Sequence, residues 1–197
     1  MYLKYFVYVS SVNNLSDARY CSGMFVDYIG FNFDENSRNH ITIEKFMEIK
    51  NWINGPKIVA EFGNSSWSHT QDYLSNIDVD YININYKFKY IKKLKNKLII
   101  NIPDLNDVRD NLEIITQNSS NLKAIIVDQF DDFSRNYIKT LSNHDVFIGK
   151  KETLNQTESV LKKYNFGLKL SGSEELRPGY KDYTNLSDTL EKITLPT

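Results

Sequence analysis

The chain alternates short apolar segments, rich in β-branched and aromatic residues, with segments of helical period, and this alternation occurs eight times. It is the pattern of a parallel sheet covered by helices. The predicted strands run from Leu3 to Val9, Tyr28 to Phe33, Lys57 to Phe62, Asp80 to Ile84, Leu98 to Ile102, Lys123 to Asp128, Val146 to Gly149 and Gly167 to Ser171. Most are apolar throughout, as strands buried on both faces are. Eight β/α units in 197 residues predict an α/β protein, a compact (β/α)8 TIM barrel that occupies residues 1–197 as a single domain.

Apolar residues between the predicted strands recur at three- and four-residue steps, so each segment is expected to pack one face on the barrel. The three clearest sets are Leu105, Val108, Leu112 and Ile115; Phe46, Ile49 and Ile53; and Leu186, Leu190 and Ile193. Asn13 or Asn14 before Leu15, and Asp104 after Pro103, are expected to cap helices, because short polar side chains accept hydrogen bonds from free N–H groups.

The charge and cysteine content excludes several classes of partner. With 24 basic and 25 acidic residues the net charge is −1, so neither nucleic acid nor an anionic membrane is an expected partner. No apolar run approaches the roughly 20 residues that span a bilayer. The single cysteine, Cys21, excludes an internal disulfide, and the N-terminus shows neither a basic leader nor a cleavable apolar segment. We therefore expect a cytoplasmic protein.

The ligand site of such a barrel lies where the strands end and the βα loops begin. The residues expected there share small or polar side chains. They are Ser10 and Ser11, Asp34 to Asn39, Asn64, Asn83 to Tyr86, Asp128, Gly149 and Lys150, and Ser171 to Ser173.

Segments at the two ends of the chain resemble phosphoribosylanthranilate isomerase, a barrel enzyme of tryptophan biosynthesis. Residues Val9 to Ala18 are similar to the family's K-I-C-G-x-T-N-x-x-D-A, and Val26 to Phe33 to its G-A-D-x-x-G-F-x-F. Lys169 to Asp182 resembles D-V-S-S-G-V-E-x-x-P-G-x-K-D, with the last lysine and aspartate in step. The resemblance covers nearly the whole chain unevenly, and it implies the same barrel fold.

The family's reaction is an Amadori rearrangement, in which an acid protonates the ribose ring oxygen and a base removes the C2 proton, so two groups of opposite protonation state are required. The resemblance places the acid on Asp128, at the end of predicted strand six. The alternative is that Asp128 only caps the following helix.

The base position departs from the family, because its cysteine is Ser10 here. A thiol has a reference pKa of roughly 8.5 and supplies some thiolate near neutrality, whereas a serine hydroxyl needs a helper such as histidine. His40, His69 and His144 show no supporting pattern, and Cys21 is expected to be a small buried thiol of the first helix.

The substrate-binding positions also depart from the family. The Q-L-H-G after strand four begins at Asn83 here, and the arginine that holds the anthranilate carboxylate aligns with Asn39, although Arg38 is its neighbour. The glycine loop G-G-T-G-x-x-F-D-W after strand six is absent, since the chain passes from Asp128 directly to Phe130 and Phe133.

The phosphate end of the site is partly kept. Barrels of this kind hold phosphate with backbone N–H groups from the loops after strands seven and eight. The family's G-G-L-x-x-x-N corresponds to residues 149–155, and its S-S-G to Ser171, Gly172 and Ser173. Lys150 replaces a glycine, so it either blocks the loop or offers a positive charge to phosphate, and a weakened or altered anion site is expected.

Three functions remain open on these residues. The chain is an active isomerase, an enzyme acting on another phosphorylated sugar or amine, or a non-catalytic homologue. The reading we prefer is a barrel of this family with strongly reduced or lost isomerase activity that still receives a small phosphorylated molecule. It is expected to be a monomer or homodimer, and no metal or other cofactor is implied.

Overall fold

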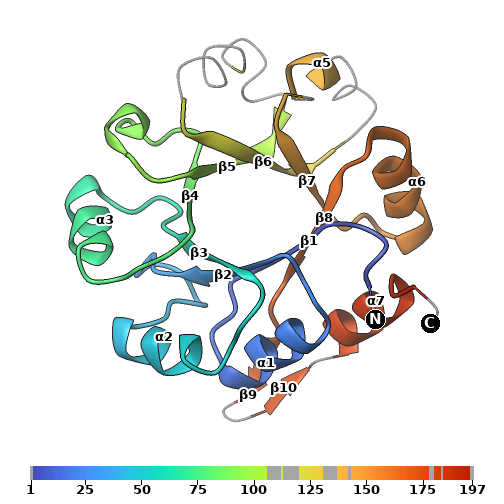
Figure 1. The fold of residues 1–197 in the computed structure, drawn as a ribbon, viewed down its shortest axis with the longest axis horizontal. Helices are drawn as coiled ribbons and strands as arrows, with labels where there is room; N and C mark the ends of the chain where they lie inside the picture. The colour runs from blue at the N-terminus through green and yellow to red at the C-terminus, as the bar shows by residue number, and fades with distance from the viewer. Residues whose placement is uncertain are drawn as a thin grey trace.

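Eight parallel strands form a closed barrel in the computed structural model, which describes residues 2–105, 112, 120–130, 137–141, 143–177, 180–182 and 184–195. Each strand pairs with the next in the chain, and β8 pairs with β1, so no sheet edge remains (Figure 1). The strands are β1 (Val7–Ser10), β2 (Tyr28–Asn32), β3 (Lys57–Glu61), β4 (Tyr81–Asn85), β5 (Leu98–Asp104), β6 (Leu122–Gln129), β7 (Asp145–Gly149) and β8 (Gly167–Ser171). The predicted (β/α)8 barrel is confirmed.

Helices surround the barrel and turn their apolar faces inward (Figure 1). They are α1 (Leu15–Gly23), α2 (Ile43–Lys50), α3 (Trp67–Leu74), the 3₁₀ turn η1 (Ile91–Lys93), the short α5 (Ile138–Leu141), α6 (Leu154–Tyr164) and α7 (Thr184–Lys192). The side chain of Asn14 accepts a hydrogen bond from the Asp17 N–H and so caps α1, as predicted. None of the helices in the described part of the chain is long and apolar enough to cross a membrane.

Most strand boundaries differ from the sequence prediction by one or two residues, and two differences matter more. β1 begins at Val7, because Leu3 forms only an isolated bridge with Thr194. Asp104, predicted to cap a helix, is instead the last residue of β5 and pairs with Gln129 of β6. Of the apolar set that begins at Leu105, only Leu105 and Leu112 are described, and both are buried; the rest of that predicted helix lies outside the described residues.

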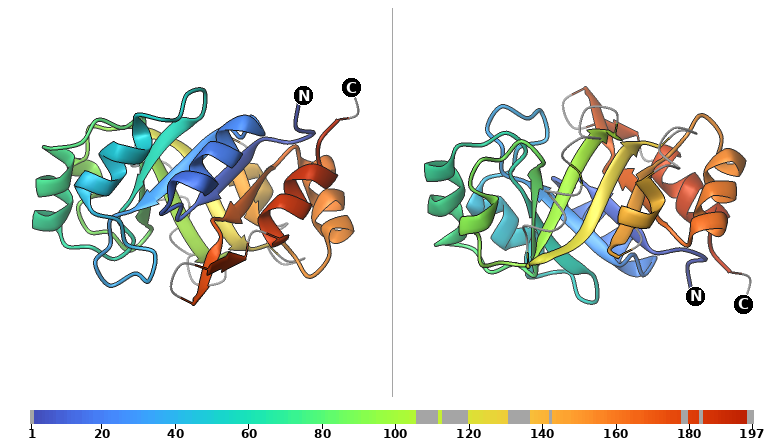
Figure 2. Two further views of the ribbon diagram at one scale, coloured as in Figure 1. Left: turned by 90° about the horizontal axis from the view of Figure 1, so that it is seen from below. Right: turned by 90° about the horizontal axis from the view of Figure 1, so that it is seen from above.

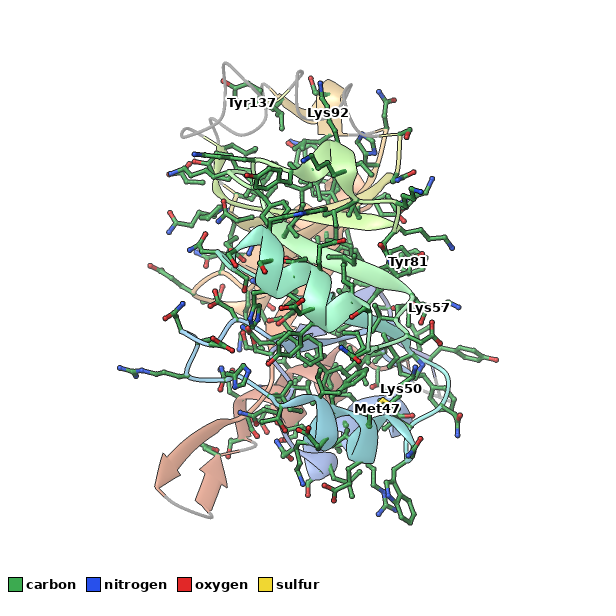
Figure 3. The ribbon with its side chains drawn as sticks, turned by 90° about the vertical axis from the view of Figure 1, so that its left-hand side faces the viewer. Met47, Lys50, Lys57, Tyr81, Lys92 and Tyr137 are labelled. Carbon is green, nitrogen blue, oxygen red and sulfur yellow. The ribbon has the colours of Figure 1, made fainter. Side chains whose placement is uncertain are left out.

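A short antiparallel hairpin, β9 (Glu174–Arg177) and β10 (Tyr180–Asp182), follows β8 and was not predicted. It projects from the end of the barrel opposite the two termini (Figure 2). Lys57 and Tyr81, the first residues of β3 and β4, lie on the side away from this hairpin (Figure 3). The hairpin therefore marks the carboxyl end of the strands, where ligand sites of such barrels lie.

Aromatic rings fill the amino-terminal half of the barrel interior. Tyr28 packs edge-on against Tyr81 and Phe147, with ring centroids 5.4 Å apart in both pairs, and the buried Tyr8 packs 6.0 Å from Phe147. Val59, Ile99, Ala124 and Ile126 complete this inner cluster. A larger core lies between the outer face of the strands and the helices. The barrel is therefore packed solid below its site, as in other small barrels.

Gly30 of β2 gives this interior its space for a polar group. A Cβ atom on Gly30 would lie 2.1 Å from Glu61 Oε1 and 2.5 Å from the Tyr8 hydroxyl. Glu61, the last residue of β3, is buried and accepts a hydrogen bond from Tyr8 at this point. The glycine therefore lets a carboxylate lie inside the barrel.

We expect Gly30→Ala to lower the free energy of unfolding by about 1–3 kcal/mol, because overpacking a filled interior forces side chains from their positions. The measurement is urea unfolding of both proteins. Gly23→Ala is the matched control, since a Cβ there has no atom within 4 Å, and alanine is the better helix former. Equal unfolding midpoints for Gly30→Ala and the unmodified protein would contradict this packing.

Candidate functional site

A cavity of about 440 Å³ opens at the carboxyl ends of β6, β7 and β8. It is lined by Asp128, Gly149, Lys150, Lys169, Leu170, Ser171, Gly172, Ser173, Asp182, Asn185 and Leu186. Six residues that the sequence predicted for the site therefore meet around one space, although they come from three strands and the loops after them. A cavity of this size suits a small ligand.

The charged centre of the cavity is an ion pair between β6 and β8. Lys169 Nζ lies 2.6 Å from Asp128 Oδ1, and the two side chains are 17% and 32% exposed. Gly149 of β7 lies between these strands, and a Cβ on it would be 2.5 Å from the Asp128 carbonyl oxygen. The Asp128 carboxylate therefore pairs with a lysine at the wall of the cavity, and the segment that it was alternatively expected to cap lies outside the described residues.

Lys150 follows β7 and is held toward α7. Its Nζ donates hydrogen bonds to Asn185 Oδ1 at 2.8 Å and to Thr189 Oγ1 at 3.1 Å. A lysine ammonium has three donors, and its contacts within the described part of the chain engage two of them. The opposite charge on this wall is Asp182, whose exposed carboxyl has its pKa lowered by the hydrogen bonds that Thr184 donates to it.

The backbone N–H groups of the loop after β8 are already engaged. Gly172 N–H donates to the Ser10 carbonyl at 2.8 Å, and Ser173 N–H donates to Asp17 Oδ2 at 2.8 Å. The Ser173 hydroxyl also donates to Asp17, a buried carboxylate in the first turn of α1. These two N–H groups would have to release their partners to hold an anion. The groups of the cavity that attract phosphate are therefore chiefly the ammonium groups of Lys150 and Lys169.

Ser10 lies next to the cavity without lining it. Its side chain is buried, its Oγ donates to the Leu170 carbonyl at 3.1 Å, and Ser171 Oγ is 3.5 Å away. No histidine is paired with it in the part of the chain that the structure describes: His69 Nε2 contacts the Phe33 carbonyl, and His40 contacts Tyr73. Nothing in these contacts would activate the hydroxyl as a base.

Cys21 cannot take the place of the missing thiol. It lies buried in α1, and burial together with the charge of Asp17 raises the pKa of its thiol to about 12. The thiol therefore stays protonated near neutrality.

Glu61 lies beneath the cavity with a complete set of partners. The Tyr8 hydroxyl donates to Oε1, and the N–H and hydroxyl of Ser11 donate to Oε2 at 3.0 and 3.1 Å. Ser11 has φ +56°, a left-handed conformation that favours glycine, and the family pattern quoted above has a glycine at this position. The bonds to Glu61 hold a serine in this conformation.

Burial raises the pKa of the Glu61 carboxyl, while the hydrogen bond from Tyr8 and the charge of Lys169 act in the opposite direction. Burial and the charge of Glu61 likewise raise the pKa of the Tyr8 hydroxyl well above its usual value, and Asp128 adds to that effect. The side chains that interact within the barrel mouth are therefore those of Glu61, Asp128, Tyr8 and Lys169.

The other predicted binding residues lie away from the cavity. Asn83 is buried in the middle of β4 and hydrogen-bonds the Tyr8 side chain inside the barrel. Asn39 Oδ1 accepts a hydrogen bond from Asn13 at 3.3 Å in the loop after β2, and the neighbouring Arg38 is exposed. Neither Arg38 nor Asn39 lines the cavity.

Lys169 and Glu61 are the important residues that sequence reasoning did not select. Lys169 is the single charge of Gly-Leu-Lys-Leu-Ser, and Glu61 is the charge at the carboxyl end of Lys-Ile-Val-Ala-Glu, whose other charge, Lys57, begins the strand. Such a charge is placed inside a barrel only with partners, and this was the available signal. Among the described residues, no group of three or more His, Cys, Asp and Glu side chains is placed to hold a metal ion.

The site and fold together define a (β/α)8 barrel with a polar, ion-paired cavity at the carboxyl ends of its strands. Solved structures of phosphoribosylanthranilate isomerases share this fold. One of them, in complex with reduced 1-(o-carboxyphenylamino)-1-deoxyribulose 5-phosphate, is 18% identical, with a TM-score of 0.75 over 95% of this chain and 97% of that chain.

The isomerase from Thermotoga maritima is 16% identical, with a TM-score of 0.74 over 96% of this chain and 98% of that chain. The isomerase from Thermus thermophilus is also 16% identical, with a TM-score of 0.72 over 95% and 97%. No protein-family model and no curated protein matches the sequence. At these identities the likeness establishes the fold.

We expect the stability that Glu61 contributes to fall as the pH rises above the unfolded pKa of a glutamate, about 4.3, and through the raised pKa of the folded state. A carboxyl whose pKa is raised by folding binds its proton more tightly in the folded state, so this contribution is complete below the unfolded pKa of about 4.3 and is lost above it. The measurement is urea unfolding across this pH range for the unmodified protein and Glu61→Gln.

The stability of Glu61→Gln relative to the unmodified protein should increase with pH. The exposed Glu48→Gln on α2 is the control, in which that increase is absent. A difference between Glu61→Gln and the unmodified protein that does not change with pH would disprove this account of Glu61.

Proposed function

We propose that this chain is a divergent barrel of the phosphoribosylanthranilate isomerase family that binds a small phosphorylated ligand beside Asp128 and whose isomerase activity is strongly reduced or lost. The resemblance at both ends of the sequence supports the family, as does a shared fold over nearly the full length of both chains. The solved isomerase that carries a ribulose 5-phosphate derivative supports the class of ligand.

The ion pair between Asp128 and Lys169 is the observation that carries the proposed loss of activity. The Asp128 carboxylate accepts a hydrogen bond from Lys169 Nζ at 2.6 Å, so it is engaged by a side chain of the protein and is not free to face the ring oxygen of the isomerase substrate. The base position offers only the buried Ser10 hydroxyl, which donates its hydrogen bond to a carbonyl. Both members of the acid–base pair are therefore altered.

Two alternatives keep catalysis. One is an active isomerase, and the other is an enzyme acting on another phosphorylated sugar. The second is favoured by one observation: the cavity presents two carboxylates, Asp128 and Asp182, and two lysines at the carboxyl ends of the strands. Fold alone does not decide among them.

We expect the purified protein to convert phosphoribosylanthranilate at least about a thousandfold more slowly than an ordinary family member, because general acid–base groups contribute roughly 10²–10⁴ each. The measurement is the steady-state decay of substrate fluorescence. Rescue of a tryptophan auxotroph that lacks the isomerase, at ordinary expression, would contradict the proposal.

Ser10→Cys is expected to restore little or no turnover in the same assay, since Asp128 remains paired with Lys169 and residue 10 does not line the cavity. Ser10→Cys combined with Asp128→Asn is the control. Robust activity in the single variant that disappears in the double variant would show an isomerase site that lacks only its base.

Ribulose 5-phosphate and inorganic phosphate are expected to bind in the cavity, and Lys150→Glu should weaken that binding by about tenfold or more, since an attractive charge becomes repulsive. The measurement is isothermal titration calorimetry. Lys151→Glu makes the same change at a neighbouring residue outside the cavity lining and should have a smaller effect. Absence of phosphate-ester binding to the unmodified protein would disprove this part of the proposal.

A further inference from the structure

Lys169 is an amine inside the barrel mouth. It occupies the middle of β8, and its flanking residues Leu168 and Leu170 are buried in the outer core. Because side chains alternate along a strand, Lys169 faces the opposite side, toward the barrel axis, and its side chain lines the cavity. At 17% exposure it is largely removed from water.

Packing does not account for a lysine at this position. A buried ion pair gives little net stability over apolar residues of similar volume, because both charges lose their hydration. The barrel interior holds Val59, Ile99 and Ile126 in its lower layer, so apolar residues are accommodated there. Lys169 instead lines the cavity at the carboxyl ends of the strands, where barrels of this kind place the residues that act on a ligand.

We propose that Lys169 is the nucleophile of an amine-catalysed reaction and forms a Schiff base with the carbonyl group of a small phosphorylated ketose or aldose, with Asp128 as its proton carrier. This inference rests on the proposed function for the ligand class, a phosphorylated sugar. The cavity offers a second ammonium at Lys150 for the phosphate, and Ser171 and Gly172 leave room for the sugar.

The ion pair supplies both the nucleophile and the acid by one proton transfer. Transfer from Lys169 Nζ to Asp128 Oδ1, across 2.6 Å, gives a neutral amine beside a carboxylic acid. The amine adds to the carbonyl carbon, and the carbonyl oxygen takes the proton from Asp128, which forms a carbinolamine. Asp128 then accepts a proton from the nitrogen and returns it to the hydroxyl, which leaves as water.

The products are a protonated imine on Lys169 and one water molecule, so atoms and charge balance with the starting ammonium and carbonyl compound. The step needs no oxidant, reductant or cofactor. Glu61 lies below the cavity, and its charge interacts with that of Lys169, so a second carboxylate stabilises the positive iminium nitrogen.

The test is reductive trapping. The full chain is incubated with dihydroxyacetone phosphate or ribulose 5-phosphate and sodium borohydride, and the intact mass is measured. We expect a single adduct whose mass equals that of the sugar phosphate less one oxygen, and peptide mapping should locate it on Lys169. Asp128→Asn should slow the labelling by roughly a hundredfold, as loss of a general acid does.

Lys169→Arg keeps a positive charge beside Asp128 but has no amine to form an imine, so its adduct should be absent. Lys151→Arg, a neighbour outside the cavity lining, should be labelled as the unmodified protein is. An adduct spread over surface lysines, or one that persists in Lys169→Arg, would overturn the inference.

Calorimetry on the same samples separates this inference from the proposed function. Phosphate-ester binding without trapping would reject the Schiff base and leave the phosphate site standing. Labelling of Lys169 by unphosphorylated dihydroxyacetone, with no phosphate-ester binding, would support Schiff-base formation on Lys169 and reject the phosphate site. If the protein shows no phosphate-ester binding and no labelling, both the phosphate site and the Schiff base are rejected.

Discussion

The carboxylate of Glu61, held inside a closed barrel, determines how the upper half of the molecule is built. A carboxyl group removed from water is tolerated only when its oxygens are bonded. Tyr8 and Ser11 supply those bonds, and Gly30 leaves the space in which they form. Ser11 takes a left-handed conformation in the process. Glu61 therefore links β3 to β1 inside the barrel and holds the chain at Ser11, directly after β1.

The charge of Glu61 is coupled to the charged residues of the cavity through Lys169. Lys169 forms a direct ion pair with Asp128, and its charge also interacts with that of Glu61 below it. Asp17 makes a parallel connection outside the barrel, where it fixes the loop after β8 through Ser173. These contacts form a polar layer across β1, β3, β6 and β8, above the aromatic cluster that fills the other half. A ligand would meet preorganised charges instead of a flexible surface.

This layer explains how a barrel can keep its fold while its chemistry changes. The aromatic cluster shares no residue with the cavity lining, and of the outer core only Leu170 and Leu186 reach the lining among the described residues, so the polar residues of the cavity can vary at little cost to folding. The family pattern has cysteine and aspartate where this chain has Ser10 and Lys169. Lys169 places a positive charge 2.6 Å from Asp128 Oδ1.

The sequence by itself determined the barrel, because eight apolar strands alternating with helical segments have few other ways to bury their surface. It also placed Asp128, Gly149, Lys150 and the serines after β8 at one end, since parallel strands end together. It did not determine that Lys169 faces Asp128, that Glu61 lies beneath them, or that Arg38 and Asn39 stay outside. Those relations join residues from different strands, and strand register and barrel closure decide them. Local patterns carry no information on such pairings, whereas the direction of each side chain in the closed barrel fixes them.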